Sequence, residues 1–182
     1  DLTGVAISIG PGSFTGLRIG LATAKMLSYA LSIPVVAVSS LEAMAYHYPV
    51  PGVYVASVLD AQKSNAYFAL CEWNGKGFDE KKQTCVMDFE EVAKYCSTLD
   101  KPVVFVGDIA QKKADIIAQY ENVSLGLPHL CMPRASNVAM AAKARFENED
   151  YDNIMDLEPV YIRRSEAEVL WEKRHGEKLT DL

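Results

Sequence analysis

Cysteine is scarce in this sequence, and its four cysteines lack the spacing of a metal site. Cys71, Cys85, Cys96 and Cys131 include no C-x-x-C pair, and the three histidines lie far apart in the chain. These spacings exclude the common zinc-binding and thioredoxin-like motifs. Cysteines of this kind are typical of a reducing compartment, so we expect a cytoplasmic protein with reduced thiols.

The sequence also lacks an excess of basic residues and a long uninterrupted apolar run. Lys and Arg number 18 against 24 Asp and Glu, which gives a net charge of −6, and the basic residues are scattered. This composition argues against direct, non-specific binding to nucleic acid, which needs a basic face. Arg18 and Lys25 interrupt the longest apolar stretch, so we expect neither a signal peptide nor a membrane span.

Glycine, in contrast, is concentrated near the start of the chain. A β-branched run, Val5 to Ile9, meets the turn Gly10-Pro11-Gly12-Ser13-Phe14-Thr15-Gly16, and a helical pattern follows to Leu31. A turn of this kind can aim backbone N–H groups at an anion. No Gly-Lys-Ser/Thr follows, and the glycine spacing is too long for a dinucleotide fingerprint. The residues therefore favour a tight turn with Ser13 or Thr15 as the helix cap over a phosphate site.

The helix after this turn has a stripe of small and apolar residues. Small residues recur at every fourth position, which would let a neighbouring element approach closely. The stripe fits a helix packed on its own sheet and, equally, a contact with a helix of another chain. Its members are Gly16, Leu17, Gly20, Leu21, Ala24 and Ser28.

The rest of the chain predicts an α/β protein. The periodicities and turn residues indicate strands over 33–38, 53–60, 65–73, 82–87 and 103–106 and helices over 39–47, 88–97, 110–120, 136–146 and 165–176. We also expect an exposed acidic loop over 147–156 and an extended segment over 160–163. Ser39 with Glu42, and Asp88 with Glu91, resemble capping boxes, and Asn74-Gly75 predicts a hairpin turn. We expect units over 1–50 and 53–163, and a last helix over 165–176 that packs back on the first unit.

Few other residues suggest chemistry. Asp60 follows a predicted strand, where open α/β sheets place reactive carboxylates, but an Asx-turn role is equally consistent. Arg163-Arg164 fits an acidic partner or, more simply, a helix cap. No spacing suggests a Ser-His-Asp triad.

At GPGSFTGLRIGLATAK the sequence resembles the TsaB (YeaZ) family, bacterial proteins needed to make threonylcarbamoyladenosine in transfer RNA. The stretches Ile33-Pro34, Ser39 to Ala43, Val58 to Ala61, Val106-Gly107 and Glu158 to Arg164 agree in the same order. The resemblance implies an actin-like, sugar-kinase-like (ASKHA) fold with two related α/β subdomains. The chain begins with Asp1 rather than Met, and we expect a fragment that lacks roughly the first sixty family residues and has an incomplete first subdomain.

The resemblance also implies that the active site has degenerated. The catalytic paralogue TsaD carries an H-x-x-x-H metal pair, and the matching residues are Ser40 and Met44. Asp60-Ala61 and Gly107-Asp108 replace its glycine-rich nucleotide turns. We therefore expect no catalytic residue, no metal and no bound cofactor in this chain.

The implied function is that of a non-catalytic partner of TsaD in the modification of transfer RNAs that read codons beginning with A. The ATPase TsaE would act on the complex, transfer RNA would bind only through it, and ATP and a metal would be held by the partners. The resemblance places the partner surface on the small-residue stripe and implies a homodimer when TsaD is absent. Gly10 to Gly16 and Arg18 would be the family motif. The alternative is an enzyme of the same fold, either a nucleotide-binding phosphotransferase or a glycoprotease-like metallopeptidase.

Overall fold

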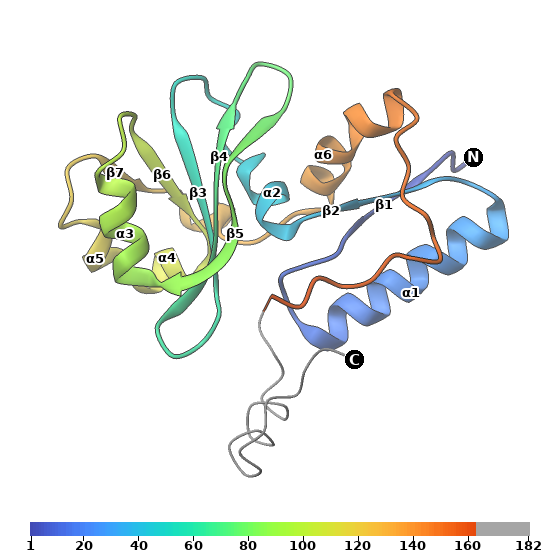
Figure 1. Ribbon diagram of the computed structural model, residues 1–182, viewed down its shortest axis with the longest axis horizontal. Coiled ribbons are helices and arrows are strands. Elements are labelled where there is room, and N and C mark those ends of the chain that lie inside the picture. Colours follow the sequence, from blue (N-terminus) through green and yellow to red (C-terminus); the bar gives the residue numbers. More distant parts are fainter. Residues whose placement is uncertain (163–182) are drawn as a thin grey trace, which may run out of the picture.

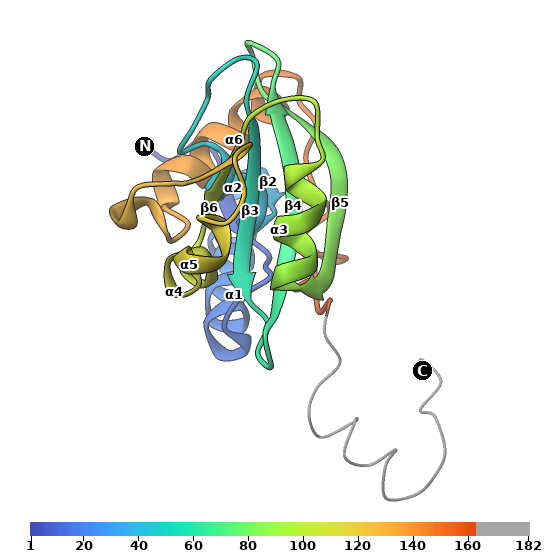
Figure 2. The ribbon, with the colours of Figure 1, turned by 90° about the vertical axis from the view of Figure 1, so that its left-hand side faces the viewer.

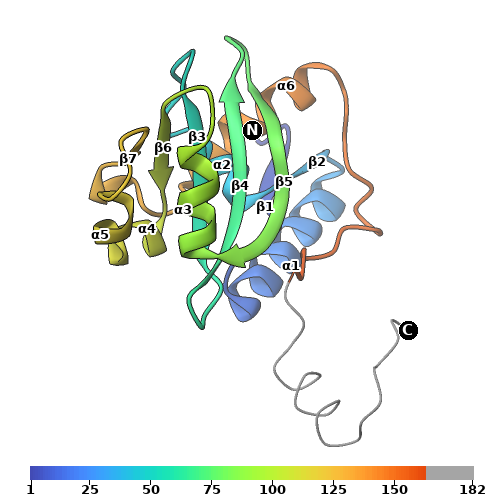
Figure 3. The ribbon, with the colours of Figure 1, turned by 60° about the vertical axis from the view of Figure 1, so that its left-hand side comes forward.

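The computed structural model describes residues 1–162, and these form two α/β units side by side (Figure 1). The smaller unit contains a two-stranded parallel sheet of β1 (Val5–Ser8) and β2 (Val35–Val38). The larger unit contains a five-stranded sheet in the order β5-β4-β3-β6-β7, which Figure 3 shows across its width. The α/β fold predicted from the sequence is therefore confirmed.

The first unit is a strand–helix–strand crossover. α1 (Phe14–Leu31) joins β1 to β2 and begins at Ser13, whose hydroxyl accepts a hydrogen bond from the Gly16 N–H at 3.3 Å. α1 ends at Ser32, which adopts the left-handed conformation. α1 packs on one face of the sheet, and α6 (Ala135–Glu147) packs on the other (Figure 1). The sequence predicted Ser13 or Thr15 as the helix cap, and the cap is Ser13.

The second unit begins with an antiparallel meander, β3 (Tyr54–Asp60), β4 (Asn65–Trp73) and β5 (Phe78–Asp88). The predicted turn at Asn74 is confirmed, since its side-chain oxygen accepts from the Lys76 and Gly77 N–H groups at 3.0 and 2.9 Å. The parallel strands β6 (Val103–Val106) and β7 (Val123–Leu125) complete the sheet.

Helices cover both faces of the larger sheet (Figure 2). α3 (Phe89–Ser97), α4 (Asp108–Lys112) and α5 (Ala114–Ile117) bury one face with a core that includes Phe68, Phe89 and Phe105. α2 (Ser40–Ala45) buries the other face through Leu41 and Met44. Because α2 directly follows β2, it joins the two units. Among residues 1–162, no helix has the length and hydropathy needed to cross a membrane.

Two sequence predictions of local structure need correction, and one strand was missed. The helix expected over 110–120 is broken at Lys113, which lets α4 stay against β3 while α5 reaches β7. β7 was not predicted, because three residues are too few to show a period. β5 starts at Phe78 rather than Lys82, since its charged residues lie on a sheet edge where polar side chains are tolerated.

The expected division into units also changes. α6 was assigned to the second unit over 53–163, but its buried residues Val138, Ala141 and Ala142 pack with Val36 and Val38 of β2. The chain therefore returns to the first unit at α6. The helix expected over 165–176 and the Arg163-Arg164 pair lie outside the described residues.

The segment after α6 is attached to β2 by polar contacts. One carboxylate oxygen of Asp152 accepts from the Ala37 N–H at 2.7 Å and from Arg145 of α6 at 3.0 Å. The Asp152 N–H donates to the Val35 carbonyl at 3.0 Å, and Arg145 also binds Asp150. The acidic loop expected over 147–156 is therefore not simply solvated, because Asp152 supplies β2 with an edge partner.

Candidate functional site

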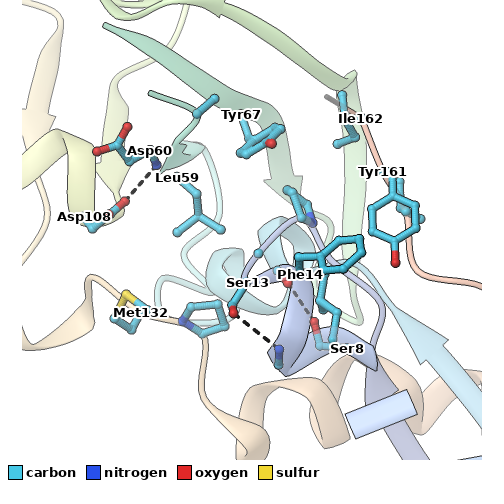
Figure 4. A pocket seen from close by; sticks show the side chains of 18 of the residues that line it. Ser8, Ser13, Phe14, Leu59, Asp60, Tyr67, Asp108, Met132, Tyr161 and Ile162 are labelled. Atoms are coloured by element: carbon cyan, nitrogen blue, oxygen red, sulfur yellow. Dashed lines mark hydrogen bonds between the residues drawn. The ribbon is translucent and has the colours of Figure 1, made fainter. Parts of the chain in front are cut away.

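A cleft with a volume of about 870 Å³ lies where the two units meet (Figure 4). It is formed by the carboxyl ends of β1 and β3, the glycine-rich turn, the first residues of α2 and α4, and the segments around Met132 and Tyr161. Ligands of open α/β proteins bind outside the carboxyl ends of the strands, so this position is that of a binding site. The structure brings together the predicted glycine-rich turn, Ser40, Asp60, Ala61 and Asp108.

The glycine-rich turn is shaped by close contacts. Gly10 has a φ of 112°, and a Cβ added there would lie 3.1 Å from the Leu17 side chain and 3.2 Å from the Val160 carbonyl. Pro11 is buried, whereas a Cβ added at Gly12 would have no neighbouring atom within 4 Å. The backbone conformation and the close packing of the turn therefore require glycine at position 10. This agrees with the tight turn that the sequence favours. No lysine, arginine or histidine belongs to the cleft lining in the described part of the chain.

An aromatic pair lies at one end of the cleft. The Phe14 and Tyr161 rings are 5.5 Å apart, and about half of each residue is exposed. Arg18 lies outside the lining, with its guanidinium 4.1 Å from the Phe14 ring centre and its Nε donating to the Tyr161 hydroxyl at 2.9 Å. Arg18, a member of the predicted motif, thus connects α1 to the segment that follows α6.

The paralogue's metal positions carry no metal-binding chemistry here. The Ser40 and Ser8 hydroxyls are 2.7 Å apart and share a hydrogen bond, while Met44 is fully buried in the core. A hydroxyl and a buried thioether are poor ligands for a hard cation. Across residues 1–162, no group of three or more His, Cys, Asp or Glu side chains is arranged to hold a metal ion.

Two carboxylates lie at the other end of the cleft, at the ends of β3 and β6. One Asp108 oxygen accepts from the Asp60 N–H at 3.0 Å, and one Asp60 oxygen accepts from the Gln62 N–H at 2.7 Å. Their second oxygens both face the Lys112 ammonium, at 2.9 Å from Asp60 and 3.5 Å from Asp108. The hydrogen bond from Lys112 lowers the pKa of Asp60 below its ordinary value. Asp60 therefore forms the Asx-type turn and also an ion pair.

Gly107 holds the start of α4 against β3. Its φ is 140°, and a Cβ there would lie 1.6 Å from the Val58 carbonyl oxygen. The glycine that the sequence suggested as a remnant of a nucleotide turn therefore has a packing reason of its own.

The C-terminal half of the small-residue stripe of α1 faces inward. Leu21, Ala24 and Ser28 are buried, and a Cβ at Gly20 would lie 3.4 Å from Ile7 of β1. Leu21, Ala24 and Ser28 therefore offer little surface to a partner, and burial argues against these three as interface residues. Gly16 is exposed, and its prediction as an interface residue stays a prediction. The outward face of α1 instead exposes Ile19, Met26, Leu27 and Tyr29, at 63%, 63%, 40% and 76%.

A second, smaller cavity lies between α2 and the β4–β5 pair. Glu42 of α2 and Glu80 of β5 line it together with Cys71. Burial raises the pKa of Glu42 above its ordinary value, and Glu80 adds to the rise, while Arg145 and the Ser39 N–H oppose it. The bond from Ser39 is the reciprocal half of the predicted capping box. Burial also raises the pKa of Cys71 to about 12.

Replacing Glu42 with Gln should make stability less dependent on pH. Since the folded-state pKa of Glu42 is raised, the folded protein binds more protons than the unfolded chain between an unfolded pKa of about 4.3 and the raised value. The free energy of unfolding therefore falls as pH rises through that window. Gln keeps the capping acceptor but does not titrate. Urea unfolding near pH 4 and pH 7 should show Glu42→Gln gaining stability over the wild type at the higher pH, and an equal difference at both values would contradict the interpretation.

Several residues in or beside the cleft were not predicted from the sequence. Lys112 was one of many scattered lysines, and Tyr161 and Met132 come from irregular segments without a period. His47 is a further such residue, and its ring nitrogens form hydrogen bonds with the Met132 carbonyl (3.0 Å) and the Asn137 side chain (3.1 Å). It thus holds one wall of the cleft in place.

Two α/β units with a cleft at the carboxyl ends of their strands define an α/β protein with a binding cleft between two units. YeaZ from Pseudomonas aeruginosa has a similar fold, with a TM-score of 0.73 and 23% identity over 88% of this chain and 73% of that one. A second Pseudomonas aeruginosa structure, an uncharacterized protein with similarity to peptidase YeaZ, has a TM-score of 0.72 over 89% and 74% at the same identity.

Sequence comparisons narrow the class to a family. Residues 1–171 match the family model of TsaD, tRNA N6-adenosine threonylcarbamoyltransferase. The tRNA threonylcarbamoyladenosine biosynthesis protein TsaB of Bacillus subtilis (strain 168) is 32% identical over 94% of this chain and 74% of the relative. TsaB of Escherichia coli (strain K12) is 28% identical over 98% and 77%. The chain belongs to this family, among its TsaB (YeaZ) members.

Proposed function

We propose that this chain takes part in threonylcarbamoyladenosine formation in transfer RNA as a non-catalytic partner of a TsaD transferase. The names of its relatives support the pathway. The observation that carries the partner role is the outward face of α1, where Ile19, Met26 and Tyr29 are exposed on one helix and no element within residues 1–162 covers them. An uncovered apolar face of this kind is typical of a protein interface.

The cleft supports a non-catalytic role. Phosphoryl transfer needs cations around the phosphate groups, and the cleft lining in the described residues contains two aspartates and no basic residue. Ser40 and Met44 stand where a metallopeptidase of this fold would need imidazoles. In this proposal ATP and a metal are held by TsaD and TsaE, and transfer RNA meets the chain only through the complex. Without TsaD, the same face would pair two copies of the chain.

Charged substitutions on the outward face of α1 test this proposal. Ile19→Arg and Met26→Arg should each weaken the complex with the TsaD of the same organism by about tenfold or more, because a charge would be desolvated in an apolar contact. Light scattering would give the mass of the complex, and a modification assay with ATP, threonine and transfer RNA would give activity. Thermal unfolding should be unchanged, since both side chains are exposed.

The matched control is Met140→Arg, because Met140 is similarly exposed but lies on α6. It should leave complex and modification unchanged. Gly20→Leu is a poor probe, since the new side chain would press on Ile7 rather than on a partner. A complex that survives Ile19→Arg with Met26→Arg would place the partner surface elsewhere, and modification by this chain without TsaD would reject the non-catalytic role.

A further inference from the structure

The two ends of the cleft differ in chemistry, and together they fit one kind of ligand. Figure 4 shows Asp60 and Asp108 at one end, the Phe14 and Tyr161 rings at the other, and Leu59 and Tyr67 between them. The walls are mainly apolar, and the charged groups that residues 1–162 contribute to the lining are both carboxylates. A phosphate or carboxylate would meet two like charges, and no lining residue in the described part of the chain supplies a cation.

The Lys112 ammonium indicates what the carboxylate end accepts. Each aspartate uses one oxygen to hold a backbone N–H, and the two remaining oxygens converge on the Lys112 Nζ. The Lys112 side chain is 59% exposed. Exposed ion pairs contribute about 0–1 kcal/mol, so another ammonium group could displace Lys112 at little cost.

We propose that the cleft binds a small molecule with an aromatic or apolar body and a primary amine, with the amine at Asp60 and Asp108 and the body against Phe14 and Tyr161. The site selects against phosphorylated ligands. This inference goes beyond the proposed function, which requires no ligand in the cleft. It does not depend on the α1 face, and so the two can fail separately.

Matched probes separate the amine from the ring. Phenethylamine and 3-phenylpropionate share a phenyl ring on a short chain and differ in the sign of the terminal charge, and ATP tests phosphate. In ligand-detected NMR titrations of the whole protein, phenethylamine should bind with millimolar affinity, at least about tenfold more tightly than either anion. An anion that binds as tightly as the amine would overturn the proposal.

Substitutions assign the binding to this cleft. Lys112→Met should strengthen phenethylamine binding by about two- to fivefold, since it removes the competing ammonium. Lys94→Met is the control, because this exposed lysine lies on α3 rather than on the two carboxylates. Asp60→Asn should weaken binding by about tenfold while its amide oxygen keeps the bond from Gln62, and Phe14→Leu should weaken it through loss of the ring face.

The sign of the Lys112→Met effect is decisive. A merely structural role for Lys112 would make the variant bind more weakly or unchanged, and either result overturns the proposal. So does the absence of phenethylamine binding to both the wild type and Lys112→Met, at concentrations where thermal unfolding shows each protein folded.

Discussion

Gly107→Ala should destabilise the protein by about 4 kcal/mol, because backbone strain and overpacking, each costing about 1–3 kcal/mol, act at the same atom. The φ of 140° is a conformation that L-residues with a side chain rarely adopt. The added Cβ would lie 1.6 Å from the Val58 oxygen and 2.7 Å from the Val58 carbonyl carbon. These are backbone atoms of the central strand β3, which is paired on both sides and cannot move away.

Substitutions at two other glycines separate the effect of backbone strain from that of overpacking. Gly52 has a φ of 76° and no atom within 4 Å of an added Cβ, so Gly52→Ala should cost about 1 kcal/mol from strain alone. Gly12 has neither a positive φ nor a close neighbour, and Gly12→Ala should be nearly neutral. Urea unfolding of the three variants should give this order. If Gly107→Ala unfolds at the same urea concentration as Gly12→Ala, the start of α4 does not approach β3 as described.

Asp152→Ala should cost about 2 kcal/mol, mainly because it leaves the Ala37 N–H of β2 without its acceptor. The Arg145 guanidinium would keep its bonds to the Ala37 carbonyl and Asp150, so the loss should stay below that of a fully buried ion pair. Urea unfolding would measure the change.

Two neighbouring substitutions give the controls. Asp150 also pairs with Arg145 but contacts no β2 backbone, so Asp150→Ala should change stability little. Asp152→Asn keeps an acceptor oxygen for the Ala37 N–H but removes the charge. Its loss of stability should therefore lie between those of Asp150→Ala and Asp152→Ala. If Asp150→Ala and Asp152→Ala are equally destabilising, the ion pairs rather than the β2 contact stabilise this segment.

The sequence was most informative where a pattern is local. Both ends of α1 were predicted, since a segment of 18 residues with a helical apolar pattern follows the Ser13 cap. The helix ends before Ser32, which adopts the left-handed conformation. The turn at Asn74 and the caps at Ser39 and Asp88 were also predicted, because their hydrogen bonds join residues two or three positions apart.

The sequence was less informative where the same residue pattern is compatible with two different structures. A small-residue stripe allows close approach by any neighbour, so only the fold shows that Leu21 and Ala24 face the sheet. Asp152 could not be distinguished from the solvated acids around it, because its partner Ala37 lies 115 positions away. Lys112 joins two strand ends in the same way, across 52 positions to Asp60.

The return of α6 to the first sheet has a consequence for how the chain folds. The five-stranded sheet and its helices α3 to α5 come from one continuous stretch, so its contacts can form early. The first sheet needs α6, and the entire second unit lies between them in the sequence. Closing that long loop costs entropy that only the finished contact repays. During synthesis, the apolar face of β1 and β2 that α6 covers therefore stays exposed until α6 has left the ribosome. The smaller unit is then the part of the chain that needs protection by chaperones.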